Sequence, residues 1–545
     1  MFKRTILVVS FLAIIAFLSG AKASAQNVTN INTAETFPTI QAAIDDADTV
    51  NGHTIRANPG TYAELVTVNK SLIIEGAKHD VDARRTAIRT GLPAVESVVT
   101  GNAGTTAFYV TVNNVTIDGF TVQGNTNVNQ FGGGIFLAPN TSGHTIENNI
   151  VQNNIIGIQL GSDSTTIRQN LFQNNNNAGA GSGNAIYSDQ FVSGGTLTGI
   201  TITNNTFTSN NSAGVSLSAS AAGTQSGITI SENIMTGNGN AVFAGFVTTL
   251  SITKNTITAS IGSQIAFGGG VSGVTISENF IDNGSTNGIR VLDVFGGAPA
   301  NTGVTANCNS ISGNPTAGIN ITTGTYTGVF DAKRNWWGSA TGPNTPKNPG
   351  GTGDKIIDPD NVVQFSPFIT SGTDTQPATK GFQCDQTQLG FAAQAASWTT
   401  TGDSSVTEDE SNPARPTYTN FTAAANAGSP IGSYVLRYNI QATSSLTTPG
   451  ATNTRLRVRF RDDCDICTRV TVAIIRSGIS GGLSQIGPLF DSDAYAPSNG
   501  FQTQEITFPA VTFDFTQNSY WLEVTLTKPI TESQPAFGSA QITQQ

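Results

Sequence analysis

The stretch GVTISENFIDNGSTNGIRVLD, residues 273–293, contains short runs in which apolar and polar residues alternate, separated by turns rich in asparagine and glycine. Alternation with a period of two indicates strands that bury one face. A closely similar phrase, GITISENIMTGNGNAVFAG, occupies residues 227–245. Two such near-copies indicate an internal repeat, and the fold must account for it.

The phrase [IV]-x-x-N recurs along the first two thirds of the chain. Steps of roughly 20 to 30 residues predict a solenoid, because each unit buries its apolar face only by stacking on the next. No helical periodicity lies between the strands, which favours a parallel β-helix over leucine-rich or βαβ solenoids. We interpret the repeated asparagines as a structural ladder of stacked amides, with Gly76 and Gly119 in the equivalent place. The ladder residues are Asn149, Asn170, Asn205, Asn233, Asn255, Asn279, Asn309 and Asn335.

A charged row accompanies the asparagines. Glu232, Lys254 and Glu278 precede the ladder asparagine in three successive coils. Opposite charges would therefore stack one coil apart, as cross-strand pairs do in a sheet. We interpret this row as a device that helps to specify the register.

A second pattern, G-[IV]-x-[LVF], follows the asparagine turns and predicts the next wall of each coil. Its outward position x carries aromatic side chains, amides and one arginine, which would suit a sugar chain lying across the coils. Scattered exposed aromatic residues, which are common, are the alternative explanation. The row is Phe136, Gln159, Tyr187, Ser216, Phe243, Ala266, Arg290 and Asn320.

Both ends of the solenoid carry segments suited to covering an open edge. At the far end, Trp336 and Trp337 interrupt the repeat, and we interpret them as a hydrophobic lid rather than a sugar platform. At the start, the segment FPTIQAAIDDAD, residues 37–48, predicts a short amphipathic capping helix. Its apolar face would consist of Phe37, Ile40, Ala43, Ile44 and Ala47.

The opening segment FPTIQAAIDDADTVNGHTIRANPGTYAELVTVNKSLIIEGA and the repeats after it resemble the pectin-lyase-like superfamily of right-handed parallel β-helix repeat proteins, which includes NosD-like periplasmic proteins. The NWWG…GP ending is similar to that of many secreted bacterial members. The resemblance covers about residues 30–370. It implies a right-handed β-helix and the activities of carbohydrate lyases, hydrolases and esterases, although many members have no assigned catalysis.

Each enzyme class in that superfamily requires its own constellation. Hydrolysis of the polygalacturonase type requires clustered aspartates, and the repeats contain no adjacent Asp pair. The later Asp-bearing segment of pectinesterases also has no counterpart. A site of the pectate-lyase type requires carboxylates that hold calcium beside a basic residue. The candidates are Asp163, Asp189, Arg290 and Asp293, which lie at different offsets from their strands.

The N-terminal residues predict export. Lys3 and Arg4 precede the apolar run TILVVSFLAIIAFLSG, and Ala23-Ser24-Ala25 is a small-residue cleavage site, so residues 1–25 are predicted to be a secretory signal. We expect a secreted or cell-surface protein without a membrane span, since no second long apolar segment follows. The formal net charge of −10 argues against a nucleic-acid partner.

Four cysteines are an even number for an oxidising compartment. Cys464 and Cys467 are close enough in sequence to pair, which leaves Cys308 and Cys384 as the other predicted disulfide. No metal site is predicted from CDIC, because the histidines lie far upstream. Calcium is left open as a cofactor, with Glu408 to Glu410, or Asp491 and Asp493, as acidic loop candidates.

The repeat stops near residue 370. We predict a β-helix over residues 26–370, a polar linker over 371–388 and, from longer alternating strands, a β-sandwich over 389–545. Four arginines alternate along one of those strands and would share a face. This face is either an anion-binding strip or a solvated surface; its residues are Arg455, Arg457, Arg459 and Arg461.

The predicted fold is thus all-β, a capped right-handed parallel β-helix followed by a β-sandwich. The preferred function is binding of extracellular polysaccharide or a cell-surface glycan, by a monomer, without turnover. A polysaccharide lyase or glycoside hydrolase is the first alternative, and a structural adhesin or spacer is the second. Titration against acidic and neutral glycans, with and without calcium, distinguishes these classes.

Overall fold

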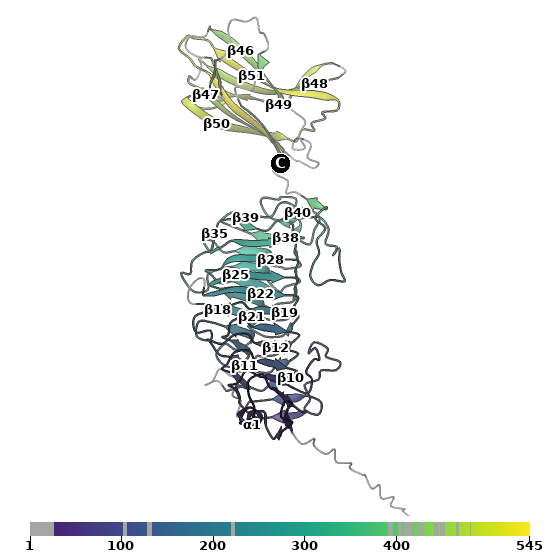
Figure 1. Ribbon diagram of the computed structural model, residues 1–545. Coiled ribbons are helices and arrows are strands. Elements are labelled where there is room, and N and C mark those ends of the chain that lie inside the picture. Colours follow the sequence, from purple (N-terminus) through teal and green to yellow (C-terminus); the bar gives the residue numbers. More distant parts are fainter. Residues whose placement is uncertain are drawn as a thin grey trace, which may run out of the picture. The chain divides into compact units, whose positions relative to one another are not determined.

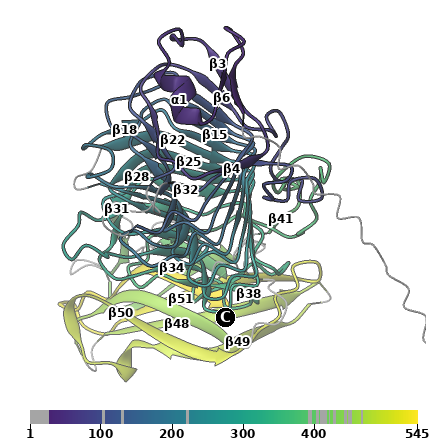
Figure 2. The same cartoon turned by 90° about the horizontal axis from the view of Figure 1, so that it is seen from below.

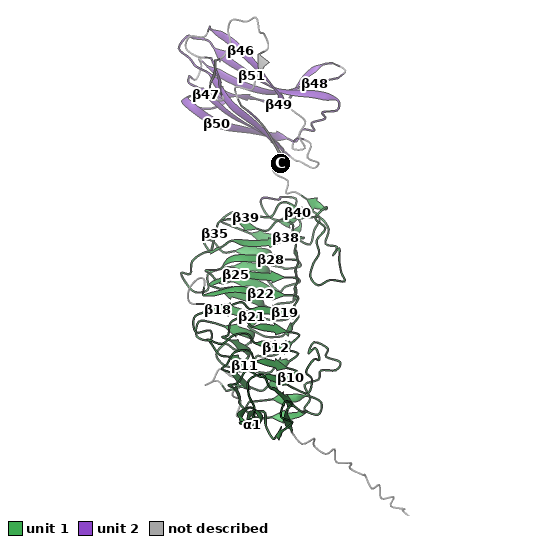
Figure 3. Ribbon diagram, in the orientation of Figure 1, with its two compact units in different colours: residues 1–346, 350–391 green, residues 347–349, 392–545 purple. Residues whose placement is uncertain are grey.

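The computed structural model describes residues 27–544, except 102–105, 128–132, 220–223, 391–395, 402–405, 408–416, 420–421, 426–429, 441–445, 447–452, 465–467 and 480. The predicted signal segment, residues 1–25, lies outside this described part. The chain forms two compact units, residues 1–346 with 350–391, and residues 347–349 with 392–545 (Figure 3). No helix within the described part is long and apolar enough to cross a membrane.

The first unit is the predicted right-handed parallel β-helix, in which each coil contributes one strand to each of three parallel sheets (Figure 1). We call these sheets A, B and C. The opening motif forms one coil, with β28 (Ser272–Ser277) in sheet A, β29 (Phe280–Asp282) in sheet B and β30 (Asn287–Val291) in sheet C. Its alternation is that of a one-sided sheet, because Ile276 is fully buried while Thr275 is exposed.

The strands of each sheet follow one another coil by coil. Sheet A begins with three antiparallel strands, β2 (Thr36–Phe37), β1 (Val28–Asn30) and β3 (Thr54–Ala57). Its parallel strands after β3 are β6 (Ile73–Glu75), β9 (Thr116–Asp118), β12 (Thr145–Glu147), β15 (Thr166–Arg168), β19 (Thr201–Thr203), β22 (Gln225–Ser231), β25 (Val247–Thr253), β28, β32 (Val304–Asn307), β36 (Phe330–Asp331) and β39 (Val363–Gln364). One further strand, β18 (Leu197–Thr198), pairs with β22. Sheet B consists of β4 (Gly60–Tyr62), β7 (Ser97–Val99), β10 (Phe120–Gln123), β13 (Ile150–Gln152), β16 (Leu171–Gln173), β20 (Thr206–Thr208), β23 (Ile234–Thr236), β26 (Thr256–Thr258), β29 and β33 (Ser310–Ser312). Sheet C consists of β5 (Val66–Val68), β8 (Phe108–Val110), β11 (Gly133–Leu137), β14 (Ile156–Leu160), β17 (Asn184–Ser188), β21 (Ala213–Ser218), β24 (Asn240–Gly245), β27 (Ile265–Phe267), β30, β34 (Ala317–Ile321), β38 (Gly353–Ile357) and β37 (Pro343–Asn344). Two small pairs, β31 (Asn301–Thr302) with β35 (Tyr326–Thr327) and β40 (Phe368–Ile369) with β41 (Leu389–Gly390), complete the unit.

The capping helix is shorter than the sequence predicts. Helix α1 spans Ile40–Asp45 at one end of the stack (Figure 2), and Thr39 caps it by accepting a hydrogen bond from the backbone N–H of Ala42. Its buried face consists of Ile40, Ala43 and Ile44, which belong to the predicted apolar face. Phe37 instead belongs to β2, and Ala47 is exposed beyond the end of the helix. At the other end, Trp337 is fully buried, as a lid residue should be.

The asparagines form a continuous buried ladder between sheets A and B. From Asn170 onward, the side-chain oxygen of each one accepts hydrogen bonds from the backbone N–H and the Nδ2 of the asparagine one coil before it, at 2.8 to 3.2 Å. Each Nδ2 also donates to a strand carbonyl, as in the 2.8 Å bond from Asn279 to the oxygen of Ile252. The buried atoms of the ladder amides themselves therefore all have hydrogen-bond partners, which is the condition for burying them.

The left-handed bend of each coil lies at the residue before the ladder asparagine and not at the asparagine itself. Glu232, Lys254 and Glu278 have φ values of 57°, 57° and 58° and thus occupy the bend, whereas the ladder asparagine follows it. Gly119, with φ of 79°, aligns with this bend and not with the ladder. Phe120 takes the ladder position there, and its N–H donates to Asn149 at 2.9 Å.

The predicted charge row is present in part. Lys254 Nζ lies 3.7 Å from Glu278 Oε2, which is a weak exposed ion pair. Glu232 accepts a hydrogen bond from Asn204 at 3.2 Å instead. The row therefore contains one ion pair, which joins the coil of Lys254 to the coil of Glu278. The ion pairs do not extend to Glu232.

A second asparagine ladder, which the sequence analysis missed, runs between sheets B and C. It consists of Asn125, Asn154, Asn175, Asn210 and Asn238, joined by amide contacts of 2.6 to 3.0 Å. The next two coils have Ser260 and Gly284, and the side chain of Gln264 fills the gap by donating to Asp282 and Ile257 carbonyls. The missed signal is an asparagine five residues after most members of the first ladder, namely Asn149, Asn170, Asn205, Asn233 and Asn309.

The segment predicted as a linker, residues 371–388, belongs to the β-helix unit, which corrects that boundary. Phe382 is fully buried against Phe280, and its N–H donates to the carbonyl of Glu278 at 2.7 Å. The predicted disulfide between Cys308 and Cys384 is confirmed and ties the segment to the coils. Cys464 is also disulfide-bonded, and its predicted partner Cys467 lies outside the described residues.

The second unit is an antiparallel β-sandwich. One sheet contains β44 (Thr417–Thr419), β45 (Thr422–Ala424), β52 (Ala536–Gln544), β47 (Asn453–Asp462), β50 (Ser498–Pro509) and β42 (Ala396–Thr401). The other contains β43 (Val406–Thr407), β46 (Gly432–Ile440), β51 (Asn518–Lys528), β48 (Arg469–Gly478) and β49 (Leu483–Asp491). Side chains from both sheets, such as Leu456 and Leu522, are fully buried in one core.

Candidate functional site

The predicted outward row lies in register along sheet C. Phe136 pairs with Gln159, Gln159 with Tyr187, and each later member with the next as far as Asn320. Neighbouring strands of a sheet are about 4.8 Å apart, so the row is a straight ladder of side chains with that spacing. The register also adds Tyr109, whose ring lies 5.3 Å from that of Phe136.

The open part of this row is a hollow of about 340 Å³ at its C-terminal half. It forms because the small side chain of Ala266 stands between Phe243 and Arg290 in the register. A large side chain on the two outer coils and a methyl group on the middle one leave a gap across the sheet. We call this hollow, with its lining residues, the sheet C groove.

One wall of the sheet C groove is polar and hydrogen-bonded. Asn240 accepts from the N–H of Ser263 at 3.1 Å, and Asn287 donates to the hydroxyl of Ser263 at 3.3 Å. Asn320 in turn donates to Asn287 at 3.0 Å. These contacts hold the amides in place before any ligand arrives, which reduces the entropy lost on binding.

The opposite wall is apolar and depends on a glycine. Leu292 and Val294 line it, and Val294 is 50% exposed. A Cβ built on Gly268 would lie 2.7 Å from Cζ of Phe243 and 2.9 Å from Cγ2 of Val294. Only a glycine therefore lets the ring of Phe243 lie close to this wall.

Arg290 is the charged side chain of the sheet C groove. Within the described part of the chain it has no hydrogen bond or ion pair, although its guanidinium carries five donors. The lining residues include no aspartate, glutamate or histidine. The groove thus offers one unpaired cation, one aromatic face and several amide and hydroxyl groups.

The three predicted catalytic carboxylates are engaged in loops. Asp163 accepts from the N–H of Thr198 at 2.7 Å, and Asp189 accepts from the backbone after it and from the hydroxyl of Tyr187. Asp293 accepts from the N–H groups of residues 295–297. The bond from Gly297, together with the others, lowers the pKa of Asp293, so this carboxylate stays ionised and holds its loop.

The N-terminal part of the predicted row is less accessible. Gln159 is only 1% exposed, which corrects its assignment as a ligand-binding residue. Ser216 is also buried, and the hydroxyl of Tyr187 donates to Asp189 at 2.8 Å. Burial, followed by the bond to Asp189, raises the pKa of Tyr187, so its hydroxyl remains a donor. The hollow of the row therefore lies at the residues from Phe243 to Arg290, while Phe136 and Tyr187 are partly exposed outside it.

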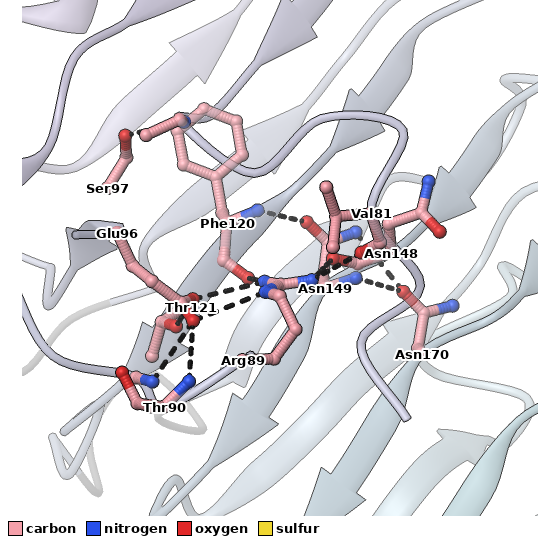
Figure 4. Close-up of polar contacts among 12 residues, drawn as sticks. Val81, Arg89, Thr90, Glu96, Ser97, Phe120, Thr121, Asn148, Asn149 and Asn170 are labelled. Atoms are coloured by element: carbon pink, nitrogen blue, oxygen red, sulfur yellow. Dashed lines mark hydrogen bonds and ion pairs between the residues drawn. The ribbon is translucent and has the colours of Figure 1, made fainter. Parts of the chain in front are cut away.

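The most enclosed charged pair lies elsewhere and is closed to ligands. Arg89 and Glu96 have fully buried side chains and form an ion pair at 3.1 Å (Figure 4). Arg89 also donates to the carbonyls of Val81 and Asn148, and Glu96 accepts from Thr121 at 2.7 Å. Burial raises the pKa of Glu96, but the bonds from Arg89 and Thr121 outweigh it and lower that pKa. This pair fastens the loop between β6 and β7 to the coils.

Acidic groups that resemble a metal site are exposed. Oxygens of Glu35, Asp46 and Asp48 lie within 4.8 Å of one another beside α1, and such clusters are common without an ion. The loop candidates Asp491 and Asp493 both face Arg469, the first at 2.9 Å and the second at 3.4 Å. The other predicted calcium candidates, residues 408–410, lie outside the described residues.

The comparisons with known proteins identify the family. The profile described as right handed beta helix region matches residues 43–225 and 181–330, which together extend over more than half of the chain. The chain belongs to this family. The cell surface glycoprotein of Methanothermus fervidus (strain ATCC 43054 / DSM 2088 / JCM 10308 / V24 S) is 35% identical over 150 residues, which are 28% of this chain and 21% of that protein. The chain thus covers about a fifth of that relative.

The chain is also similar to solved structures at low sequence identity. The Dettilon tailspike protein has a TM-score of 0.40 at 12% identity, over 87% of each chain. The Geobacillus virus E2 ORF18 protein has a TM-score of 0.40 at 11% identity, over 88% of this chain and 75% of that one. Pectate lyase Pel9A has a TM-score of 0.28 at 15% identity, over 53% and 72%. Likenesses of this size carry no argument about activity.

Proposed function

We propose that this protein is exported and binds an extracellular polysaccharide in the sheet C groove without turning it over. The observation that supports this proposal most is the register of Phe243, Ala266 and Arg290, which opens a hollow across neighbouring coils. A glycan laid along the coils would place an aromatic face under one sugar ring and a guanidinium beside the next. The polar wall would pair with sugar hydroxyls.

The placement of the carboxylates supports binding without turnover. A glycosidase positions two carboxyl groups around one bond, and a lyase needs a base beside the sugar. Asp163, Asp189 and Asp293 each hold a loop backbone instead. The one charged group lining the groove, Arg290, is a guanidinium that donates hydrogen bonds and can hold an anion.

Export is supported by three independent features. The N-terminal segment has the layout of a secretory signal. The disulfide between Cys308 and Cys384 suits an oxidising compartment. The partial relative is named a cell surface glycoprotein.

Calorimetric titration of the mature full chain against acidic and neutral polysaccharides, with and without calcium, tests the proposal. Phe243→Ala should weaken binding of every bound glycan about tenfold, equivalent to about 1.4 kcal/mol. Arg290→Ala should weaken only acidic ones. The matched control is Thr275→Ala, an exposed residue of the same coil on sheet A, which should bind as the unmodified chain does.

Two outcomes would contradict the proposal. Release of unsaturated or reducing ends, abolished by Arg290→Ala or Asp293→Ala, would show a lyase or hydrolase. Failure of every glycan to bind would leave the role of a structural adhesin or spacer.

A further inference from the structure

A second polar face lies on the β-sandwich unit, on strand β47. Its arginines alternate with Leu456, Val458 and Phe460, which are fully buried in the sandwich core. Period-two alternation therefore places all four on the outer face of the sheet. They are Arg455, Arg457, Arg459 and Arg461. Because β47 pairs with β50 on one side and β52 on the other, this face lies inside the sheet and not at its edge.

The strand register surrounds the two central arginines with polar side chains. Arg459 lies between Thr503 on β50 and Ser539 on β52. Arg457 lies beside Gln541 in the same way. A hollow of about 280 Å³ is lined by Arg457, Arg459, Thr503, Ser539 and Gln541. We call it the arginine hollow.

The outer arginines are held, whereas the central pair has no carboxylate. Arg455 lies 3.6 Å from Glu505, and Arg461 donates to the carbonyl of Gln534 at 3.0 Å. Arg459 stacks on the ring of Phe501 at 4.4 Å, which fixes the plane of its guanidinium. Arg457 has neither an ion pair nor a hydrogen bond among the described residues, because the acid opposite it, Glu505, is the one that pairs with Arg455.

The chemistry of the arginine hollow fits an oxyanion carried on a sugar. Two guanidinium groups present planar forks of donors that match carboxylate and sulfate oxygens. The hydroxyls of Thr503 and Ser539 and the amide of Gln541 both donate and accept, as sugar hydroxyls require. The lining contains no apolar side chain that would receive a lipid acyl chain. The chain carries a net charge of −10, so short-range pairing and not long-range attraction must select the ligand.

We propose that the arginine hollow is a second saccharide site, which binds an anionic saccharide through its carboxylate or sulfate-ester oxygens. It lies on a different unit from the sheet C groove and does not depend on the function proposed for that groove.

Titration of the mature full chain carrying Ala266→Phe and Arg290→Gln tests this site, because the two substitutions fill the sheet C groove and remove its charged side chain. The probes are polygalacturonate for carboxylates, dextran sulfate for sulfate esters and dextran as the uncharged backbone. We expect at least one polyanion to bind, with an affinity that falls as salt rises, and dextran not to bind. Adding Arg457→Gln and Arg459→Gln should reduce the affinity at least about tenfold, since two charge-assisted contacts are lost.

The matched control is Arg476→Gln, which removes an exposed arginine from β48 in the other sheet of the same unit. It should retain the full affinity, and all variants should keep the thermal unfolding midpoint. Arg457→Gln alone, which disturbs no packing against Phe501, should already weaken binding. Equal affinity of the double variant, an equal loss in the Arg476 control, or binding to phosphatidylserine vesicles with no binding to either polyanion would overturn the proposal.

Discussion

The ring of Phe243 and the guanidinium group of Arg290 stand two coils apart in one outward row, with only the methyl group of Ala266 between them. The hollow exists because a small residue falls at that position of the register. A row of side chains with uniform size would be a flat surface. The contrast between neighbouring coils, and not the repeat itself, therefore creates the candidate binding site.

Filling the hollow should abolish binding while leaving the fold intact. Ala266→Phe places a ring in the hollow that Ala266 lines on the outer side of sheet C, so we expect loss of glycan binding with a thermal midpoint close to that of the unmodified chain. Ala266→Ser, which is nearly isosteric, should bind normally. Calorimetry measures glycan binding and thermal unfolding measures stability. Full binding by the Ala266→Phe variant would show that glycans bind elsewhere on the protein.

Breaking one rung of the first ladder should destabilise the β-helix. Asn255 accepts from the N–H and Nδ2 of Asn233 and donates to the carbonyl of Ile230, all at 2.9 to 3.0 Å. Asn255→Ala leaves buried polar groups unpaired, which costs at least about 2 kcal/mol. Urea unfolding should show this loss, while exposed Thr275→Ala should change stability by less than about 0.5 kcal/mol. Equal midpoints for the two variants would contradict the role of the ladder.

The buried pair of Arg89 and Glu96 should show strong non-additivity. Arg89→Met leaves an uncompensated buried carboxylate and should cost about 3 to 5 kcal/mol, whereas Arg89→Met combined with Glu96→Leu should cost much less. The folded pKa of Glu96 is below its usual value of 4.5, so its stabilising contribution is present above that pH and is lost as the pH falls through the folded pKa. Urea unfolding from pH 7 to pH 3 measures both effects, and additive losses would contradict the pairing.

His144 should make the protein less stable in mild acid. Its ring is 1% exposed and contacts the hydroxyl of Thr141 at 3.0 Å, and burial lowers its pKa from 6.5 to about 4. Between these values the unfolded chain binds a proton that the folded chain does not, so stability falls as the pH decreases from about 6.5 to about 4. The loss is up to about 3 kcal/mol. His144→Gln should flatten this part of the stability profile, and an unchanged slope would show that other groups cause it.

Much of the first unit was predictable because its sequence pattern is local and repeated. The spacing of the [IV]-x-x-N phrase identified the coils, and the G-[IV]-x-[LVF] phrase identified an outward row that the structure aligns from Phe136 to Asn320. The second ladder escaped detection because serine and glycine interrupt it at Ser260 and Gly284. Gln264 compensates from a different place in the coil, and such a substitution is visible only when side chains are seen in space.

The candidate site was only partly predictable for a related reason. Nothing in the phrase around Gln159 shows that this side chain is buried. Likewise, nothing around Asp189 or Asp293 shows that these carboxylates accept hydrogen bonds from the backbone N–H groups of their own loops. Burial and hydrogen bonding of these groups depend on neighbouring coils and on the loops that leave sheet C. These loops vary in length between repeats and carry no shared pattern.

The sequence by itself determined the stacking of repeated coils with at least two strands each, the asparagine row and the set of residues that share the outer face of sheet C. It could do so because a period-two strand pattern and a fixed repeat specify which side chains align. Only the tertiary structure decided which of those residues are accessible. In the structure, a hollow lies between Phe243 and Arg290, whereas the side chain of Gln159 is buried. Residues 371–388 are attached to the coils through buried Phe382 and the disulfide. Accessibility depends on contacts between segments that are distant in sequence, and local pattern carries no information about them.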